Sequence, residues 1–289
     1  MRRLTIICTV LLVVLSISVA CTSTSAQPTP HVAFTSTPST TDIPTPRPTS
    51  TPVPTATATS TATPKSVPSP TPTGKPVSSA PKPAVVSGPL APLIVRGSTQ
   101  KPLVTLTFDS GAAAGSTATV LDILRENHIH TTFFVTGKFA EANPALIKRI
   151  VAEGHTIGSH SYSHPDMTEI SNAEIVSQLT RTEETIKRVA GVVPKPYFRP
   201  PLGAYDNRLL AVLAQQGYKA VYWTLDSTDW RDDSTTESVR KRVINNTQAG
   251  YIVVHHASTE KTAQALPSII KELRAKGLQI VNLPELLGE

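Results

Sequence analysis

The last 199 residues, from Ala91 to Glu289, predict an α/β fold of parallel strands with helices on the outside. Two observations lead to this prediction. Apolar runs of strand length alternate regularly with helical patterns, and polar residues follow several of the strands at their carboxyl ends. The alternation fits either a barrel or an open doubly wound sheet. A barrel brings all the strand-end residues together on one face.

The strand segments are short, apolar runs, and the helical segments repeat their apolar residues every three or four positions. The longest helix places Ile175, Leu179 and Ile186 on one face and is ended by Gly191. The predicted strands are Val104–Phe108, Thr131–Val135, His155–Gly158, a short one near Tyr197, Lys219–Leu225, Tyr251–Val254 and Leu278–Val281. The predicted helices are Thr117–Asn127, Pro144–Glu153, Asn172–Ala190, Asn207–Gln216, Thr236–Thr247 and Thr262–Lys276.

The amino-terminal segment predicts export. Residues 1–20 begin with a basic region, continue with a run rich in Leu, Val and Ile, and close with small residues, which is the pattern of a signal peptide. Cys21 follows directly, so the segment also resembles a bacterial lipobox, in which this cysteine is lipidated after cleavage. Such boxes usually have leucine where this chain has Ser18, and ordinary cleavage after Ala20 is the alternative. Either route places the protein on the outer face of the membrane or in the cell wall.

Residues 22–90 form a linker rich in Ser, Thr and Pro. They hold 16 of the 26 prolines and one Phe, Tyr or Trp residue, Phe34. Such a composition buries too little apolar surface to fold, so we expect disorder. Extended polyproline II geometry, at about 3.1 Å per residue, would give a reach on the order of 200 Å. The predicted organisation is therefore a signal segment, a tether and one folded domain over residues 91–289.

Charge and cysteine content exclude several classes of function. Residues 1–90 hold six Lys/Arg and one acidic residue, for a net charge of +5, while residues 91–289 hold 21 and 20, for a net charge of +1. The predicted domain is nearly neutral, so we expect no nucleic-acid partner. Both cysteines, Cys8 and Cys21, precede it. Disulfides, thiolate ligands and a cysteine nucleophile are thereby excluded from the domain.

Five short segments carry the residue types that metal-assisted hydrolysis requires. Together they contain carboxylates, a histidine pair four residues apart, an arginine beside apolar residues and a further histidine. Two histidines at this spacing lie on one face of a helical turn and can bind one ion, whereas a lone histidine is usually structural. The segments are Leu106–Gly111, His160–His164, Phe198–Gly203, Asp226–Trp230 and Ile252–His256.

In this order and spacing, the five segments resemble the five motifs of the polysaccharide deacetylases, the NodB-homology or family 4 carbohydrate esterases. The resemblance covers roughly residues 100–287. It implies a distorted, incomplete (β/α) barrel. It also implies an enzyme that removes N- or O-acetyl groups from sugars with a divalent metal ion.

The resemblance assigns the metal and its neighbourhood to the first two motifs. Asp109 takes the place of the general base that activates a metal-bound water, and His160 and His164 take the places of metal ligands. Ser110 stands where the family has a second aspartate that binds the metal. A neutral hydroxyl is a poorer ligand than a carboxylate. A bridging water, lower metal affinity or loss of catalysis are the three possible consequences.

The third and fourth motifs supply the groups around the base and the substrate. Arg199 matches the arginine that pairs with the base and keeps it ionised. Leu202 replaces a tyrosine whose backbone N–H stabilises the oxyanion, a role that the substitution spares. The resemblance assigns Asp226 to orienting and tuning the catalytic histidine and Trp230 to a wall of the groove. Asp229 is interpreted as a loop cap.

The fifth motif supplies the general acid. His256 stands where the family has the histidine that protonates the leaving amine. Val254 takes the place of the family's leucine, and His255 occupies a position that is usually apolar. We therefore interpret His256, rather than His255, as the general acid.

These interpretations predict an exported, metal-dependent N-deacetylase that acts as a monomer on a polymer of acetylated sugars. Zn²⁺ is the expected ion, and Co²⁺ or Ni²⁺ would also suit the ligands. Peptidoglycan is the favoured substrate because the tether would place the domain in a cell wall; chitin-like glycans, acetylated exopolysaccharides and O-acetyl esters stay open. The alternative is a non-catalytic glycan-binding module that has lost turnover through Ser110. The retention of the other motif residues favours the enzyme.

Overall fold

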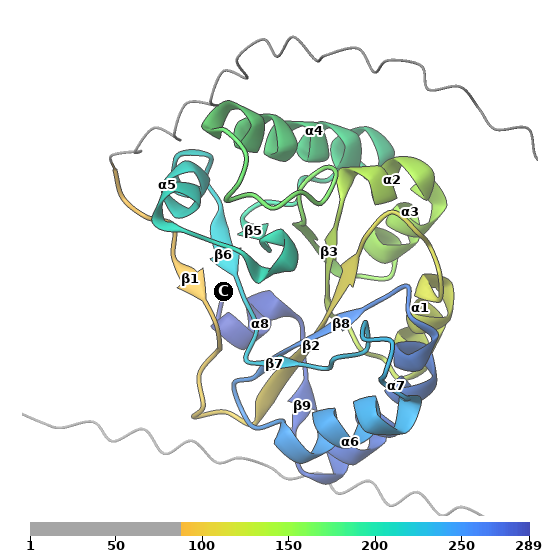
Figure 1. Cartoon of the computed structure of the whole chain (residues 1–289). Coiled ribbons are helices and arrows are strands. Elements are labelled where there is room, and N and C mark those ends of the chain that lie inside the picture. Colours follow the sequence, from red (N-terminus) through yellow and green to blue (C-terminus); the bar gives the residue numbers. More distant parts are fainter. Residues whose placement is uncertain (1–87) are drawn as a thin grey trace, which may run out of the picture. The chain divides into compact units, whose positions relative to one another are not determined.

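The computed structural model describes residues 88–289, and Figure 1 shows them as parallel strands surrounded by helices. The chain divides into two units, residues 1–72 and 73–289, and every described residue belongs to the second. The predicted signal segment, the lipidation site Cys21 and residues 22–87 of the predicted linker lie outside the described residues. Between residues 88 and 289, no helix is long and apolar enough to cross a bilayer.

The described strands form one sheet of nine strands, and all its pairings are parallel. They are β1 (Leu93–Ile94), β2 (Leu103–Ser110), β3 (Thr132–Val135), β4 (Thr156–Ser159), β5 (Tyr197–Phe198), β6 (Lys219–Val221), β7 (Leu225–Asp226), β8 (Ile252–His256) and β9 (Gln279–Ile280). Their order is β1-β6-β5-β4-β3-β2-β8-β7, with β9 beside β2. This path ends at β1 and β7, which are not neighbours in it, so the curled sheet is an incomplete barrel. The predicted fold is confirmed.

The helices follow the strands in the predicted alternation. They are α1 (Thr117–Glu126), α2 (Gly137–Ala142), α3 (Pro144–Ala152), α4 (Asn172–Ala190), α5 (Asn207–Gln215), α6 (Thr236–Asn246), α7 (Glu260–Ala275) and α8 (Leu283–Leu287), with a 3₁₀ turn η1 (Pro201–Gly203). Sequence periodicity did not predict β1, α2 or α8, which are too short to show it. The strand predicted over Lys219–Leu225 is in fact two strands, β6 and β7, separated by three residues.

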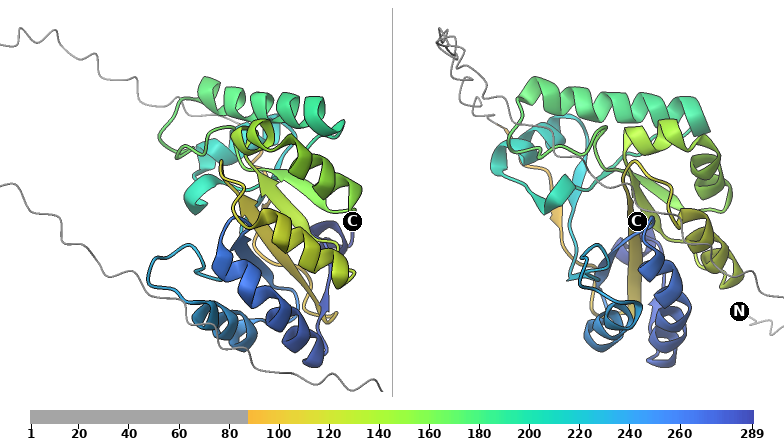
Figure 2. Two further views of the ribbon diagram at one scale, coloured as in Figure 1. Left: turned by 90° about the vertical axis from the view of Figure 1, so that its right-hand side faces the viewer. Right: turned by 45° about the vertical axis from the view of Figure 1, so that its right-hand side comes forward.

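Apolar side chains fill the space between the sheet and its helices. Buried residues of α1, α3, α6 and α7 form one cluster with those of β2, β3 and β8, and residues of α4 and α5 form a second cluster against β5 and β6. Figure 2 shows these helices on the outside of the curled sheet. The layers anchor the strands, and the strands in turn hold the loops at their carboxyl ends.

The interior of the barrel changes from apolar to polar along β2, whose eight residues are all buried. Leu103, at the start of the strand, lies in an interior cluster to which α8 contributes Leu283 and Leu286. Alternate residues of a strand share a face, so Thr107 and Asp109 follow Leu103 on this interior side. The polar groups therefore collect at the carboxyl end of the barrel, where parallel α/β barrels place their active sites.

Candidate active site

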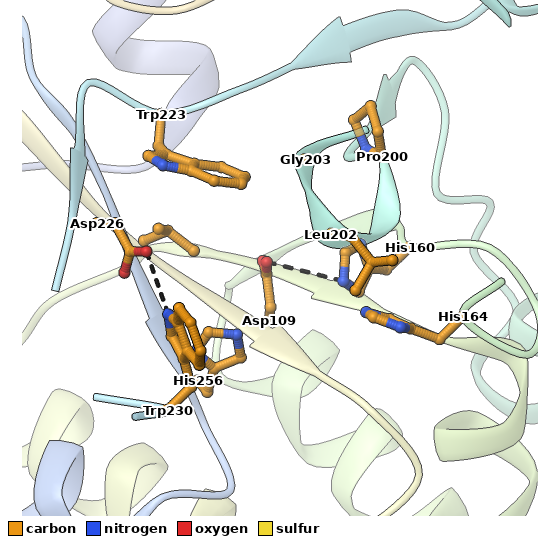
Figure 3. A pocket seen from close by; sticks show the side chains of 11 residues that line it. Asp109, His160, His164, Pro200, Leu202, Gly203, Trp223, Asp226, Trp230 and His256 are labelled. Carbon is orange, nitrogen blue, oxygen red and sulfur yellow. Dashed lines mark hydrogen bonds and ion pairs between the residues drawn. The ribbon is translucent and has the colours of Figure 1, made fainter. Parts of the chain in front are cut away.

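One pocket of about 300 Å³ lies at the carboxyl ends of the strands. Figure 3 shows its side chains converging from the ends of β2, β4, β7 and β8 and from the η1 turn. The lining residues are Asp109, His160, His164, Pro200, Leu202, Gly203, Trp223, Asp226, Trp230, Val254 and His256. The structure thus brings together the predicted catalytic, substrate-binding and metal-binding residues except Ser110 and Arg199, and Arg199 pairs with Asp109 without lining the pocket.

Asp109 and Arg199 form a buried ion pair. The Arg199 Nη1 donates to Asp109 Oδ1 at 2.7 Å and to the Thr107 hydroxyl at 2.9 Å, and Nη2 donates to the Tyr222 carbonyl at 3.1 Å. The arginine is completely buried, with its guanidinium 4.0 Å from the centre of the Phe134 ring. Burial alone would raise the pKa of Asp109, but Arg199 and the nearby His160 and His256 hold it below its ordinary value. Asp109 is therefore an ionised carboxylate with one oxygen directed toward the pocket.

His160 is held as a neutral imidazole. Its Nδ1 lies 2.8 Å from the Arg199 carbonyl oxygen, which can only accept, so Nδ1 carries the proton and Nε2 keeps its lone pair. Nε2 lies 3.8 Å from Asp109 Oδ2. Burial lowers the pKa of His160 to about 4 and also lowers that of His164. The two rings are 4.8 Å apart between centroids, so the pair presents two neutral imidazoles to the pocket.

The histidine pair does not lie on a helical turn, which corrects the sequence interpretation. Strand β4 ends at Ser159, and the residues after it form an irregular segment. Ser161 and His164 both have φ near 64°, in the left-handed region that residues with a Cβ rarely adopt. Each such residue costs on the order of 1 kcal/mol. The contacts that surround this segment must therefore hold it in place.

Ser110 is not one of the residues that line the pocket. It is completely buried, and its hydroxyl has no hydrogen-bond partner within residues 88–289. Ser110 is the last residue of β2 and directly follows Asp109, which lines the pocket. The short serine hydroxyl therefore does not reach the pocket, whereas the aspartate of the family motif has a longer side chain that ends in a carboxylate.

The sequence-based assignment of Asp226 to orienting His256 is wrong. The carboxylate that contacts His256 is Asp229. Asp229 Oδ1 lies 2.8 Å from His256 Nδ1, and Oδ2 accepts the backbone N–H of the same histidine at 2.7 Å. The hydroxyls of Thr259 and Thr262 also donate to Asp229. Although burial works against the charge, these donors lower the pKa of Asp229, and the carboxylate in turn raises the pKa of His256. Asp229 is thus the partner of the histidine and not a loop cap.

Asp226 organises the loop that contains Trp230. Its Oδ1 accepts the backbone N–H of Thr228 at 2.7 Å, and its Oδ2 accepts the indole N–H of Trp230 at 3.1 Å. Asp226 still lines the pocket, but its hydrogen bonds go to the wall rather than to the histidine. Asp226 ends β7 and Asp229 lies in the loop directly after it, so only the tertiary contacts distinguish their roles.

Apolar side chains form the walls of the pocket. Leu202 and Trp230 are exposed over 70% and 56% of their surfaces, and Val254 lies at the buried end. Trp223 also lines the pocket and stacks on Tyr222, with ring centroids 4.1 Å apart. Sequence reasoning missed Trp223 because it was included in a predicted strand. Exposed indole and leucine surfaces of this kind suit the apolar faces of a sugar or an acetyl group.

His255 points away from the pocket. Its ring is completely buried and packs edge-on against Phe108 at 5.6 Å, in the apolar layer under the helices. Neither ring nitrogen has a hydrogen-bond partner within the described part of the chain. Burial lowers the pKa of His255 to about 4, so the ring is neutral. It fills an apolar position and is not part of the pocket.

The pocket residues fit a divalent ion through two ligands. His160 and His164 offer neutral imidazoles, which suit Zn²⁺ and similar ions. No group of three or more His, Cys, Asp and Glu side chains among residues 88–289 is arranged to hold an ion. A metal bound here would therefore take its remaining ligands from outside these residue types.

The fold is an incomplete parallel α/β barrel. Its carboxyl end holds a buried carboxylate, two neutral imidazoles and an Asp–His pair, an arrangement typical of a hydrolase. Comparison with known proteins gives the family. A family model described as polysaccharide deacetylase matches residues 96–221. A peptidoglycan-N-acetylglucosamine deacetylase of Bacillus cereus is 35% identical over 194 residues, which is 66% of this chain and 70% of the relative. The PdaA peptidoglycan-N-acetylmuramic acid deacetylase of Bacillus subtilis is 33% identical, over 67% of this chain and 74% of its own length.

Solved structures agree with the sequence comparison. The crystal structure of a peptidoglycan N-acetylglucosamine deacetylase bound to a hydroxamate-type benzamide matches with a TM-score of 0.65 and 32% identity, over 68% of this chain and 94% of that one. The chain therefore belongs to the polysaccharide deacetylase family, carbohydrate esterase family 4. It is a hydrolase of carbon–nitrogen bonds, and members of this family generally depend on a metal ion.

The same fold also occurs in a pseudoenzyme. A family 4 pseudoenzyme of Bacillus anthracis matches with a TM-score of 0.62 and 29% identity, over 67% of this chain and 68% of that one. A mutant of it with restored enzymatic activity matches with a TM-score of 0.64. Activity in this family therefore depends on more than the fold, because mutation of the pseudoenzyme restored activity.

Proposed function

We propose that this chain is an exported, metal-dependent deacetylase that removes N-acetyl groups from the sugars of peptidoglycan. The observation that carries the proposal is the meeting of an ionised Asp109, two neutral imidazoles and the Asp229-paired His256 at one pocket. Acetamide hydrolysis needs a base for water and an acid for the departing amine. The two charged states required, a carboxylate and an imidazolium, are those that the surroundings of Asp109 and His256 favour.

His160 and His164 would hold the metal, with Zn²⁺ as the expected ion and Co²⁺ or Ni²⁺ as alternatives. A divalent ion at these ligands supplies a Lewis acid that polarises the acetyl carbonyl and lowers the pKa of a water molecule. The lone pair on His160 Nε2 is available because Nδ1 is committed to the Arg199 carbonyl. This carbonyl acts as the outer partner that fixes the tautomer of a metal-binding histidine.

Asp109 is the proposed base. A water molecule attacks the acetyl carbon, and its proton passes to the Asp109 carboxylate. Arg199 holds the carboxylate ionised and fixes one of its oxygens at 2.7 Å, which leaves the other free to accept the proton. Because the arginine is completely buried, this orientation does not depend on a mobile surface charge.

His256 is the proposed acid. As the bond between the acetyl carbon and the sugar nitrogen breaks, the imidazolium donates a proton to that nitrogen, and acetate and the free amine are the products. Asp229 directs Nδ1 of the ring toward itself and leaves Nε2 for the pocket. The raised pKa of His256 favours the protonated ring.

The walls of the pocket bind the acetylated sugar. The backbone N–H of Leu202, in the η1 turn, is the proposed donor to the developing oxyanion. Val254, in β8, and Trp230, in the loop after β7, also line the pocket. Their apolar surfaces are available to the acetyl methyl group and the sugar ring. Two relatives support peptidoglycan as the substrate. One is named a peptidoglycan-N-acetylglucosamine deacetylase and the other a peptidoglycan-N-acetylmuramic acid deacetylase.

Export and a lipid anchor form the second part of the proposal. The basic, apolar and small-residue order of residues 1–20 and the cysteine at position 21 support it. Metabolic labelling with palmitate and membrane fractionation of the full chain test it, with Cys21→Ser as the control. Labelled, membrane-bound protein that becomes unlabelled and secreted in Cys21→Ser is the expected result. Unlabelled wild-type protein in the medium would show that the chain is exported and would refute the lipid anchor.

The activity is tested by acetate release from peptidoglycan. We expect the purified full chain to release acetate, to lose this activity on metal removal and to regain it with Zn²⁺ or Co²⁺. Ser110 and the pseudoenzyme relative favour one alternative, a glycan-binding module without turnover. Pull-down of peptidoglycan by a folded protein that releases no acetate with any ion would establish this alternative.

A further inference from the structure

We propose that Gln178 is a positioning residue for the metal centre, because its buried side-chain amide fixes the backbone between His160 and His164. The inference rests on the proposed function, since it concerns the same two histidines. Gln178 lies in α4, outside the pocket, and is almost completely buried. No sequence motif of the site includes it.

The amide of Gln178 holds the two residues midway between the histidines. Its Oε1 accepts the backbone N–H groups of Tyr162 and Ser163, both at 2.9 Å. Its Nε2 donates to the Ser163 hydroxyl and to Glu174 Oε1, both at 3.0 Å. Backbone N–H groups can only donate, so they fix which end of the amide is the oxygen. Every hydrogen-bonding direction of this buried amide is therefore committed to the segment or to its own helix.

The other face of the segment is held by α2. The backbone N–H groups of Gly137 and Lys138, at the start of that helix, donate to the carbonyls of Ser161 and Tyr162, each at 3.0 Å. The Tyr162 ring lies so close to Gly137 that a Cβ there would come within 2.2 Å of it. The carbonyls are thus fixed by α2, while two of the N–H groups depend on Gln178.

The backbone needs this support because two of its residues are left-handed. Ser161 and His164, on either side of the Gln178 contacts, both have φ near 64°. At the two ends of the segment, the backbone N–H of His160 donates to the Val135 carbonyl at 3.0 Å, and that of His164 donates to the Ser161 hydroxyl at 3.0 Å, within the segment itself. Without the Gln178 acceptor, the segment can relax toward ordinary backbone angles, which would rotate His164 relative to His160. Gln178 therefore acts on metal binding through the backbone.

The test replaces the acceptor in the full chain. Gln178→Met keeps the length of the side chain and removes its hydrogen bonds. We expect it to weaken Co²⁺ binding about 10- to 100-fold by calorimetry, the range seen when outer partners of metal ligands are lost. The visible absorption spectrum of bound Co²⁺ should change as well, and the Tyr162 and Ser163 amides of the metal-free protein should exchange with solvent faster.

Two further variants separate positioning from general stability. Thr185→Val alters another buried position of α4, seven residues away, and should leave the Co²⁺ affinity and spectrum unchanged even if the melting temperature falls. The exchange Gln178→Glu with Glu174→Gln keeps an acceptor at 178 and a donor at 174, and should retain wild-type affinity. If Gln178→Met does not fold, the metal affinity of this double variant still tests whether Gln178 positions the histidines.

The inference is overturned if folded Gln178→Met binds Co²⁺ with wild-type affinity and spectrum, or if the double exchange folds and loses the metal. A wild-type protein that binds no Co²⁺ would instead refute the metal centre of the proposed function. In that case amide exchange still tests Gln178. Unchanged exchange at Tyr162 and Ser163 in Gln178→Met would overturn the inference without reference to any metal.

Discussion

Asp229 accepts two hydrogen bonds from His256, one from the ring Nδ1–H at 2.8 Å and one from the backbone N–H at 2.7 Å. The carboxylate thereby fixes both the position of the strand end and the tautomer of the ring. The same bonds raise the pKa of the histidine. An acid that must carry its proton at neutral pH benefits from each of these effects.

The first prediction distinguishes the roles of Asp226, at the end of β7, and Asp229, in the loop after it. Asp229→Asn should lower kcat for acetate release about a hundredfold or more, because the general acid loses the charge and tautomer control that it requires. Asp226→Asn should cost less, since its partners are Thr228 and Trp230 and it does not contact the acid. Steady-state kinetics with the two matched variants measure the difference. Equal losses would refute the assignment of Asp229.

The second prediction concerns pH. His256 must be protonated, so activity should fall as the pH rises past its pKa, which is raised above the ordinary value of a histidine. His160 must be neutral to bind metal and its pKa is about 4, so activity should also fall near and below that pH. The kcat/KM profile of the metal-loaded enzyme should therefore be a broad plateau.

The variant Asp229→Asn tests whether His256 is the group that controls the alkaline limb of that profile. In Asp229→Asn the charge that raises the pKa of His256 is absent, so the alkaline limb should move to lower pH, while the acid limb stays in place. A profile whose alkaline limb does not move would show that another group controls it.

The longest elements were predictable from sequence, and the reason is visible in α4. Its apolar residues repeat over five turns, Ser171 caps the start by accepting the N–H of Glu174, and Gly191 ends it with a left-handed backbone. These local signals are strong enough to give both boundaries. The five motifs likewise located the pocket, because residues at the ends of parallel strands meet on one face.

The features that were predicted wrongly or missed from the sequence depend on contacts between distant segments. Asp226 and Asp229 are three residues apart, and only the pairing of β7 with β8 decides which one reaches His256. The bend that separates His160 from His164 contains no glycine to signal its left-handed residues. Gln178 resembles any polar residue of an amphipathic helix until the fold brings the histidine segment against it.

The third prediction concerns the serine beside the base. The family motif has a metal-binding aspartate at position 110, so Ser110→Asp should strengthen binding of Zn²⁺ or Co²⁺ on the order of tenfold, or about 1.4 kcal/mol. Ser110→Ala should leave the affinity unchanged, because the hydroxyl is not among the groups that line the pocket. Calorimetry of the metal-free proteins measures both. If Ser110→Asp binds no tighter, a carboxylate at 110 does not reach the ion.

The fourth prediction concerns His255 and acid stability. Its pKa is about 4 in the folded chain because the ring is buried without partners, against about 6.5 in the unfolded chain. The folded state therefore resists a proton that the unfolded state accepts, and the free energy of unfolding falls as the pH drops from about 6.5 to about 4. The part due to His255 is up to about 3 kcal/mol.

His255→Leu removes this proton uptake and keeps an apolar side chain against Phe108. The variant should match or exceed wild-type stability at pH 7 and lose less stability between pH 6.5 and 4.5, as measured by urea unfolding. Acetate release should be retained, because His255 does not line the pocket. A variant that loses stability as steeply as wild type would show that the ring finds a partner in the folded protein, since a bonded imidazole could keep its proton. A loss of acetate release at full stability would instead place His255 in the function of its neighbour, His256.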